Sequence, residues 1–132
     1  MHNKEFYHWF CGYQQQAFRV NERRLVVLVG DANWASSLLK IIANGSCDHS
    51  TYDEKTWLVY GESQYIKANV DTKRFHDKLG SESDFVVFNS IGVNGAELSI
   101  DAFAALSGTL VAGGGFFLLV SDMSKLAGSL FY

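Results

Sequence analysis

The feature that most constrains the fold is a set of short apolar runs that alternate with segments of helical spacing. The first run, residues 25–29, is entirely Leu and Val and is closed by Gly30. Such a run is typical of a strand covered on both faces of a sheet, because a strand with one solvated face alternates apolar and polar residues. Strands covered on both faces are usually parallel and are joined by helices. The run therefore predicts a parallel sheet.

Three further apolar runs have the same character. They cover residues 57–60, 85–88 and 116–120. Gly61 and Glu62 close the run at 57–60, and three glycines at 113–115 are predicted to turn the chain into the last run. We therefore expect at least four strands.

Helical spacing fills the intervals between these runs. An amphipathic N-terminal helix is predicted from one apolar face, made of Phe6, Phe10, Tyr13, Ala17 and Val20. Asp31 is placed to cap a second helix, which Asn44 and Gly45 end. Residues 64–70 fit a helix or a strand equally well.

Two more helices are predicted before the third and fourth runs. Asp71 is placed to cap a short one that carries Phe75 and Leu79. The other begins at Asn94 or Ser99. Its inward face is predicted to contain Leu98, Ala102, Phe103, Leu106 and Leu110.

The alternation predicts an α/β fold, a three-layer αβα sandwich with a mainly parallel sheet of about four or more strands, of Rossmann-like or flavodoxin-like type. Residues 1–132 are expected to form a single domain, and the sequence does not give the strand order. The apolar pattern continues through residues 126–132, so we expect this domain to be the N-terminal part of a longer multidomain protein.

Composition excludes several functional classes. The 132 residues are 48% hydrophobic and 19% charged, which excludes a disordered or collagen-like chain, and proline is absent. The net charge of −3 is unfavourable for a self-sufficient nucleic-acid clamp, although a local basic patch remains open. Residues 102–121 are uncharged, but Gly108 and the glycines at 113–115 predict helix, turn and strand there, and no membrane span.

Two cysteines and the N-terminus bear on localisation. Cys11 and Cys47 fit neither a metal-ligand spacing nor a CxxC motif, so we expect free thiols in a reducing compartment. The first residues lack the continuous apolar stretch of a signal peptide. Both observations predict cytoplasmic localisation.

Ligands of open parallel sheets bind outside the carboxyl ends of the strands, so the residues that follow each run are the pocket candidates. These candidates are Gly30, Asp31, Asn33, Glu62, Asn89, Ser90 and Asp122. The same residue types are what strand-to-helix turns and helix caps require, and a purely structural role is the favoured interpretation.

Motifs for cofactors and catalysis are missing from the sequence. It has no GxGxxG turn for a dinucleotide and no Gly-Lys pair for a P-loop. Cys47, His49 and His76 do not form a usual zinc pattern, and no GxSxG elbow is present. We therefore expect no catalytic, cofactor-binding or metal-binding residue in this chain.

Two basic groups are candidate RNA contacts. They consist of Arg19, Arg23 and Arg24, and of Lys73 and Arg74. Nearby acidic residues such as Glu22 and Asp71 neutralise part of each group. Basic residues at a helix C-terminus also interact favourably with the helix dipole, which is a structural role. A solvated surface is therefore the favoured reading over an RNA site.

Three stretches together resemble the N-terminal domain of bacterial tRNA(Met) cytidine acetyltransferase. They are RRLVVLVGDANWASSLL, TWLVYGES and SDFVVFNSIGVNGAELSIDAFAALSGTLVAGGGFFLLVSD. The resemblance rests on the order and spacing of these stretches, since none of them is a catalytic motif.

The resemblance implies a parent enzyme that acetylates N4 of the wobble cytidine in elongator tRNA(Met), with acetyl-CoA and ATP or GTP. It places the nucleotide site in a helicase-like module and the acetyl-CoA site in a GNAT-type module, both downstream of this domain. The chain alone is then expected to be catalytically silent and to bind no cofactor. Its implied role is to pack on the helicase-like module, to help dock tRNA, or both.

Two alternatives remain open. The segment 106–120 is also similar to the helix-to-strand passage of S-adenosylmethionine-dependent methyltransferases, with Glu62 where they hold the ribose, although the glycine-rich first turn is missing. The other alternative is a stand-alone flavodoxin-like module that binds a protein partner through Tyr7, Trp9 and Tyr132.

Overall fold

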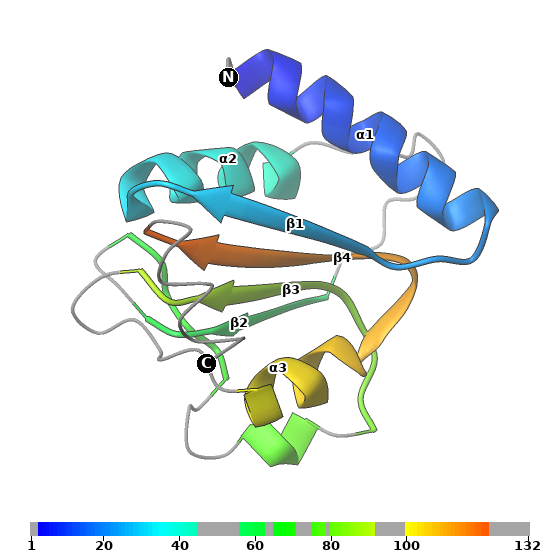
Figure 1. Ribbon diagram of the computed structural model, residues 1–132, viewed down its shortest axis with the longest axis vertical. Coiled ribbons are helices and arrows are strands. Elements are labelled where there is room, and N and C mark those ends of the chain that lie inside the picture. Colours follow the sequence, from blue (N-terminus) through cyan, green and yellow to red (C-terminus); the bar gives the residue numbers. More distant parts are fainter. Residues whose placement is uncertain are drawn as a thin grey trace.

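The computed structural model describes residues 3–44, 56–62, 65–70, 75–78, 80–91 and 100–121. These ranges contain a four-stranded sheet of β1 (Arg24–Val29), β2 (Trp57–Tyr60), β3 (Ser83–Asn89) and β4 (Leu110–Val120). The strands lie in the order β1-β4-β3-β2, and all three neighbouring pairs are parallel (Figure 1). The predicted parallel sheet is confirmed.

Helices cover both faces of this sheet. On one face lie α1 (Asn3–Arg19) and α2 (Ala32–Asn44), and on the other lie α3 (Ile100–Ser107) and the short 3-10 helix η1 (Phe75–Lys78) (Figure 1). Two apolar clusters form between the layers, one under α1 and α2 and one under α3. The predicted three-layer α/β architecture is confirmed.

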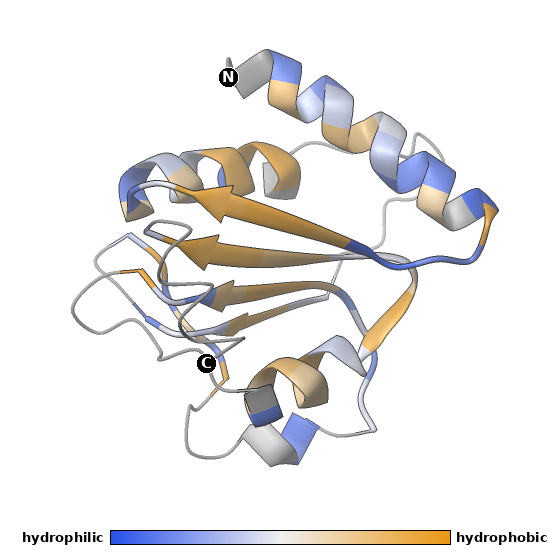
Figure 2. Cartoon of the chain, viewed as in Figure 1, coloured by the Kyte–Doolittle hydropathy of each residue, from blue (hydrophilic) through white to orange (hydrophobic). Residues whose placement is uncertain are grey.

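The central strands divide their side chains between the two clusters. Phe85 and Val87 of β3 face the cluster under α1 and α2, whereas Val86 and Phe88 face the cluster under α3. All four side chains are buried, as expected for a strand with helices on both faces. The continuous apolar colouring of the strands in Figure 2 reflects this arrangement.

The N-terminal helix is amphipathic, as predicted. Phe6, Phe10 and Ala17 are buried against the sheet or α2, and Tyr13 is half-buried. Val20 departs from the prediction, because it is 53% exposed. The helix ends at Arg19, and the chain turns at Asn21, whose φ of 56° is in the left-handed region, so Val20 no longer lies on the helix face.

β1 corrects a second expectation. Its apolar run was expected to be covered on both faces, yet Leu25 is 48% exposed and Val29 is 39% exposed. Val26 and Leu28 are buried under α1 and α2. The physical reason is the strand order, since β1 is an edge strand and α3 packs against β3 and β4.

The glycine run corrects a third expectation, because it lies inside β4 and not in a turn before it. Ser83 pairs with Leu110 and Phe85 pairs with Gly115, so β4 bulges between these positions. A Cβ on Gly114 would lie 2.8 Å from the Val111 carbonyl oxygen and 2.9 Å from that of Asp84. Leu110, expected on the helix, is the first residue of β4.

The remaining predicted elements divide into confirmed and untested ones. α2 is confirmed with its cap at Asp31. In residues 65–70 the described chain forms neither helix nor strand, apart from a single bridge between Tyr60 and Val70. Ala102 and Leu106 are buried as predicted. Asp71, Asn94 and Ser99, the predicted start residues of the other two helices, lie outside the described residues. Leu79 and Leu98 also lie outside them.

Cys11, on α1, is disulfide-bonded, so the expectation of a free thiol there is wrong. α1 packs against α2, which ends at Asn44, shortly before Cys47, the other cysteine of the sequence. Cys47 itself lies outside the described residues. Spacing along the chain carries no information on this packing, and the inference from free thiols to a reducing compartment loses its basis.

No helix within the described ranges combines the length and apolar character needed to cross a membrane.

Candidate functional site

The carboxyl ends of all four strands lie at one edge of the sheet, because the strands are parallel. Six of the seven predicted pocket residues lie along this edge, after β1, β2 or at the end of β3. The seventh, Asp122, lies outside the described residues. The predicted side chains thus lie along one edge, and the hydrogen bonds of each residue show whether it is available to a ligand.

After β1, the chain is held by a helix cap. The Asp31 carboxylate oxygen Oδ1 accepts the backbone N–H of Trp34 at 2.8 Å, and the Gly30 N–H donates to the Val120 carbonyl at 3.0 Å. A Cβ on Gly30 would lie 2.8 Å from Cε3 of the Trp34 ring. A side chain at position 30 would therefore force the Trp34 ring to shift, while Asn33 is exposed on the first turn of α2.

After β3, the polar side chains bind the backbone. Asn89 is fully buried; its amide Nδ2 donates to the Gly61 carbonyl at 3.2 Å, and its Oδ1 accepts the Ile91 N–H at 2.9 Å. Ser90 donates its hydroxyl to the Leu119 carbonyl at 2.6 Å. Asn89 therefore joins the ends of β2 and β3, and Ser90 joins the ends of β3 and β4.

After β2, Glu62 is exposed. β1 and β2 form opposite edges of the sheet, so three strand spacings, about 14 Å, separate Glu62 from Gly30. A methyltransferase-like site needs the acidic residue beside the first turn. This strand order removes the geometric basis of that alternative.

Burial raises the pKa of the Tyr60 phenol at the end of β2. The Tyr60 ring stacks on Phe88 at 4.7 Å between centroids. Its environment keeps the phenol protonated and gives it no acid-base function near neutral pH. In the described part of the chain, no group of three His, Cys, Asp or Glu side chains is placed to hold a metal ion.

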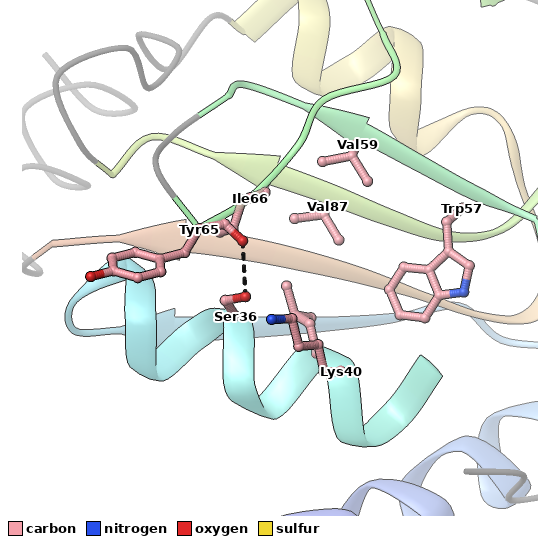
Figure 3. A pocket seen from close by; sticks show the side chains of 8 residues that line it. Ser36, Lys40, Trp57, Val59, Tyr65, Ile66 and Val87 are labelled. Carbon is pink, nitrogen blue, oxygen red and sulfur yellow. Dashed lines mark hydrogen bonds between the residues drawn. The ribbon is translucent and has the colours of Figure 1, made fainter. Parts of the chain in front are cut away.

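A pocket of about 160 Å³ lies between α2 and the outer strand β2 (Figure 3). Its walls are mainly apolar, and Ser36 donates its hydroxyl to the Tyr65 carbonyl at 3.0 Å beside it. The lining residues are Ser36, Leu39, Lys40, Trp57, Val59, Tyr65, Ile66 and Val87. Small-molecule sites usually span about 300–1,000 Å³, so this pocket suits one ring or one aliphatic side chain.

The sequence does not predict this pocket, because its walls come from segments whose relative placement depends on strand order. Trp57 and Val59 read as ordinary strand residues, and Lys40 as an exposed helix position. No spacing signal links them.

The described basic candidate residues lie at the amino ends of the strands, opposite the carboxyl ends. Arg23 and Arg24 precede or begin β1, at the amino ends of the strands, and Arg19 ends α1. Lys73 and Arg74 lie outside the described residues. The strand-end candidates and this basic group therefore do not form one site.

The three arginines differ in their contacts. Arg19 and Arg23 are exposed, and Arg23 Nε donates to the Leu110 carbonyl at 2.6 Å. Arg24 is largely covered; it pairs with Glu22 at 3.1 Å, and its guanidinium carbon lies 4.9 Å from the centroid of the Tyr13 ring. Arg19 and Arg23 are thus better placed for a phosphate than Arg24.

An aromatic stack extends from Arg24 along α1. Trp9 stacks on Tyr13 at 4.9 Å between centroids, and Trp9 is 46% exposed. The i, i+4 spacing of Trp9 and Tyr13 is the sequence signal for this contact. The spacing alone does not place Arg24 on the other side of Tyr13. Tyr7 is half-buried, and Tyr132 lies outside the described residues.

These observations define a class: a three-layer α/β domain with a parallel sheet whose strand-end polar groups are engaged largely in structural hydrogen bonds. The sequence matches the family described as tRNA(Met) cytidine acetyltransferase TmcA, N-terminal, over residues 1–128, and the chain belongs to this family. No curated protein matches the sequence. The family match confirms the resemblance and identifies a domain of a tRNA-modifying transferase.

Proposed function

We propose that this chain is the non-catalytic N-terminal domain of an enzyme that acetylates N4 of the wobble cytidine in elongator tRNA(Met), using acetyl-CoA and ATP or GTP. The domain packs on the helicase-like module of the parent enzyme, and the tRNA substrate of that family supports a cytoplasmic location. The family match over residues 1–128 supports the parent activity.

One observation carries the non-catalytic role. At the carboxyl edge, where α/β domains bind ligands, the buried amide of Asn89 and the hydroxyl of Ser90 are bonded to backbone carbonyls. The Asp31 carboxylate caps α2. A catalytic group needs a donor or acceptor directed at a substrate, and these groups are directed at the chain itself.

The pocket among the described residues is small for the co-substrates of the parent enzyme. The pocket under α2 holds about 160 Å³, well below the roughly 300 Å³ at which small-molecule sites begin. The sequence has no Gly-Lys pair from which a phosphate-binding loop is built. Both observations support our proposal that acetyl-CoA and the nucleotide bind to other modules of the parent enzyme.

A contribution to tRNA docking is supported by the amino edge of the sheet. Arg19 and Arg23 are exposed there, and exposed arginines bind phosphates. Trp9 offers a partly exposed ring on the same helix as Arg19, and such rings stack on unpaired bases. The net charge of −3 makes this contribution secondary to packing.

Two assays test the proposal. The isolated chain is incubated with tRNA(Met), acetyl-CoA and ATP, and no N4-acetylcytidine is expected. Isothermal titration of the chain into the remainder of the parent enzyme, produced without this domain, is expected to show saturable binding. Acetyl transfer by the isolated chain, or the absence of binding to the remainder, would contradict the proposal.

A further inference from the structure

The two outermost strands of the sheet, β1 and β2, differ in whether their outward backbone groups are hydrogen-bonded within the described residues. Along the outer edge of β2, the Asn69 side chain closes the ladder: its Oδ1 accepts the Val59 N–H at 2.7 Å, and its Nδ2 donates to the Trp57 carbonyl at 2.9 Å. The Val70 N–H donates to the Val59 carbonyl at 3.0 Å. The β2 edge is therefore protected against pairing with another strand.

The outer edge of β1 has no such cover among the described residues. Gly30 directs its N–H to β4, and backbone groups of successive strand residues point alternately to the two sides. The N–H and C=O groups of Leu25, Val27 and Val29 therefore point outward. They form an open edge of three residues.

The side chains of the same three residues are also uncovered. They lie on the face opposite α1 and α2, where Leu25 is 48% exposed and Val29 is 39% exposed. Val27 is half-buried against the cluster under α3. Among the described residues, β1 thus presents unpaired backbone groups beside an apolar half-face, by which we mean the side chains of Leu25, Val27 and Val29. An added strand requires such a surface.

We propose that the outer edge of β1 receives a β-strand from the part of the parent enzyme that follows this domain in sequence. The inference rests on the proposed packing function and identifies the surface that performs it. The family is the N-terminal part of an acetyltransferase, so the remainder of that enzyme continues from this domain.

Geometry supports this occupant. β4, the last described strand, ends beside β1 and at the same edge of the sheet as the end of β1. From there the outer side of β1 is two strand spacings away, about 10 Å, and residues 122–132 precede the following part of the parent enzyme. A chain of that length reaches up to about 36 Å when extended, which is enough for the following part of the enzyme to place a strand at the outer side of β1. Its apolar side chains would cover Leu25 and Val29.

Hydrogen exchange tests the pairing directly. In the 132-residue chain, the amides of Leu25, Val27 and Val29 are expected to exchange quickly, because they point outward. In the intact parent enzyme the same amides are expected to be protected. Val26 and Leu28 are internal controls, since their amides face β4 and are protected in both. Equal exchange of the outward amides in chain and parent would overturn the proposal.

Substitution tests the apolar half-face. The double variant Leu25→Lys with Val29→Lys is expected to weaken the binding of the chain to the remainder of the enzyme about tenfold or more, because lysine on an edge strand opposes pairing. Val20→Lys is the matched control, since Val20 is 53% exposed but lies outside the sheet, and it should leave binding unchanged. Melting of each isolated variant checks that it folds.

The outcomes separate the inference from the proposed function. Binding that the double variant leaves unchanged overturns strand addition at β1 but leaves the packing function standing. A chain that does not bind the remainder contradicts the packing function, and exchange in the intact parent still decides whether the edge is paired. If the unmodified chain forms dimers and the double variant does not, the edge pairs with a second copy, and the proposal is overturned.

Discussion

Replacing Asn89 by leucine tests whether the carboxyl edge of the sheet is structural. Asn89 is fully buried and joins the ends of β2 and β3 through Gly61 and Ile91. Leucine has a similar size but leaves the Gly61 carbonyl and the Ile91 N–H without these partners. Each buried polar group left unsatisfied costs about 1–3 kcal/mol. Because leucine recovers part of this by apolar burial, we expect the free energy of unfolding to fall by about 2–4 kcal/mol.

Urea denaturation, followed by circular dichroism and tryptophan fluorescence, measures this change. The control is Asn33→Leu, because Asn33 is exposed on α2, and a change within about 0.5 kcal/mol is expected there. A loss below about 1 kcal/mol for Asn89→Leu, with an unchanged dependence on urea, would refute the structural reading. The amide would then be available for a ligand, and the non-catalytic interpretation of this edge would fail.

Three other predictions concern the bulge, the buried phenol and the basic edge. Gly114→Ala should destabilise the chain by about 2 kcal/mol or more, because its Cβ would lie 2.8 Å from a backbone oxygen, whereas Gly12→Ala, with no atom within 4 Å, should stabilise α1 slightly in the same urea titration. Burial raises the pKa of Tyr60, so the unfolded chain releases this proton first and the free energy of unfolding should fall as the pH rises above about 10. Tyr60→Phe should reduce that fall, and denaturation at about pH 8 and about pH 11 measures the difference. Arg23→Gln in the parent enzyme should reduce the slope of log affinity for tRNA against log salt by about one, and an unchanged slope in filter binding would remove Arg23 from the RNA contacts.

Most of the fold could be predicted because its strands are continuous apolar runs. The run at 57–60 matches β2, and the Asp31 cap fixes the start of α2. Local rules govern such features, since an apolar run and a cap each act within a few residues.

Strand order could not be predicted, and the corrections at β1 follow from it. Val26 and Leu25 are neighbours of equal apolar character, yet one is buried and the other exposed, because β1 lies at an edge that α3 does not reach. The tight packing at Gly114 depends in part on strand order as well, since one of the two backbone oxygens closest to it belongs to Asp84 on another strand.

The candidate site was predictable in position but not in role. Parallel strands bring Gly30, Asn89 and Ser90 to one edge, as expected. The partners of Asn89 are set by its contacts with β2, which the sequence does not encode locally. The separation of the arginines from this edge also depends on three-dimensional placement.

In the proposed function, this chain has no chemistry of its own and supports the remainder of a tRNA(Met) cytidine acetyltransferase. The most direct measurement is the rate of N4-acetylcytidine formation by that remainder while the 132-residue chain is titrated in. We expect no product from the chain alone and a saturable rise in rate when the chain is added to the remainder. Product from the chain alone, or a rate that the added chain does not change, would contradict the proposed function.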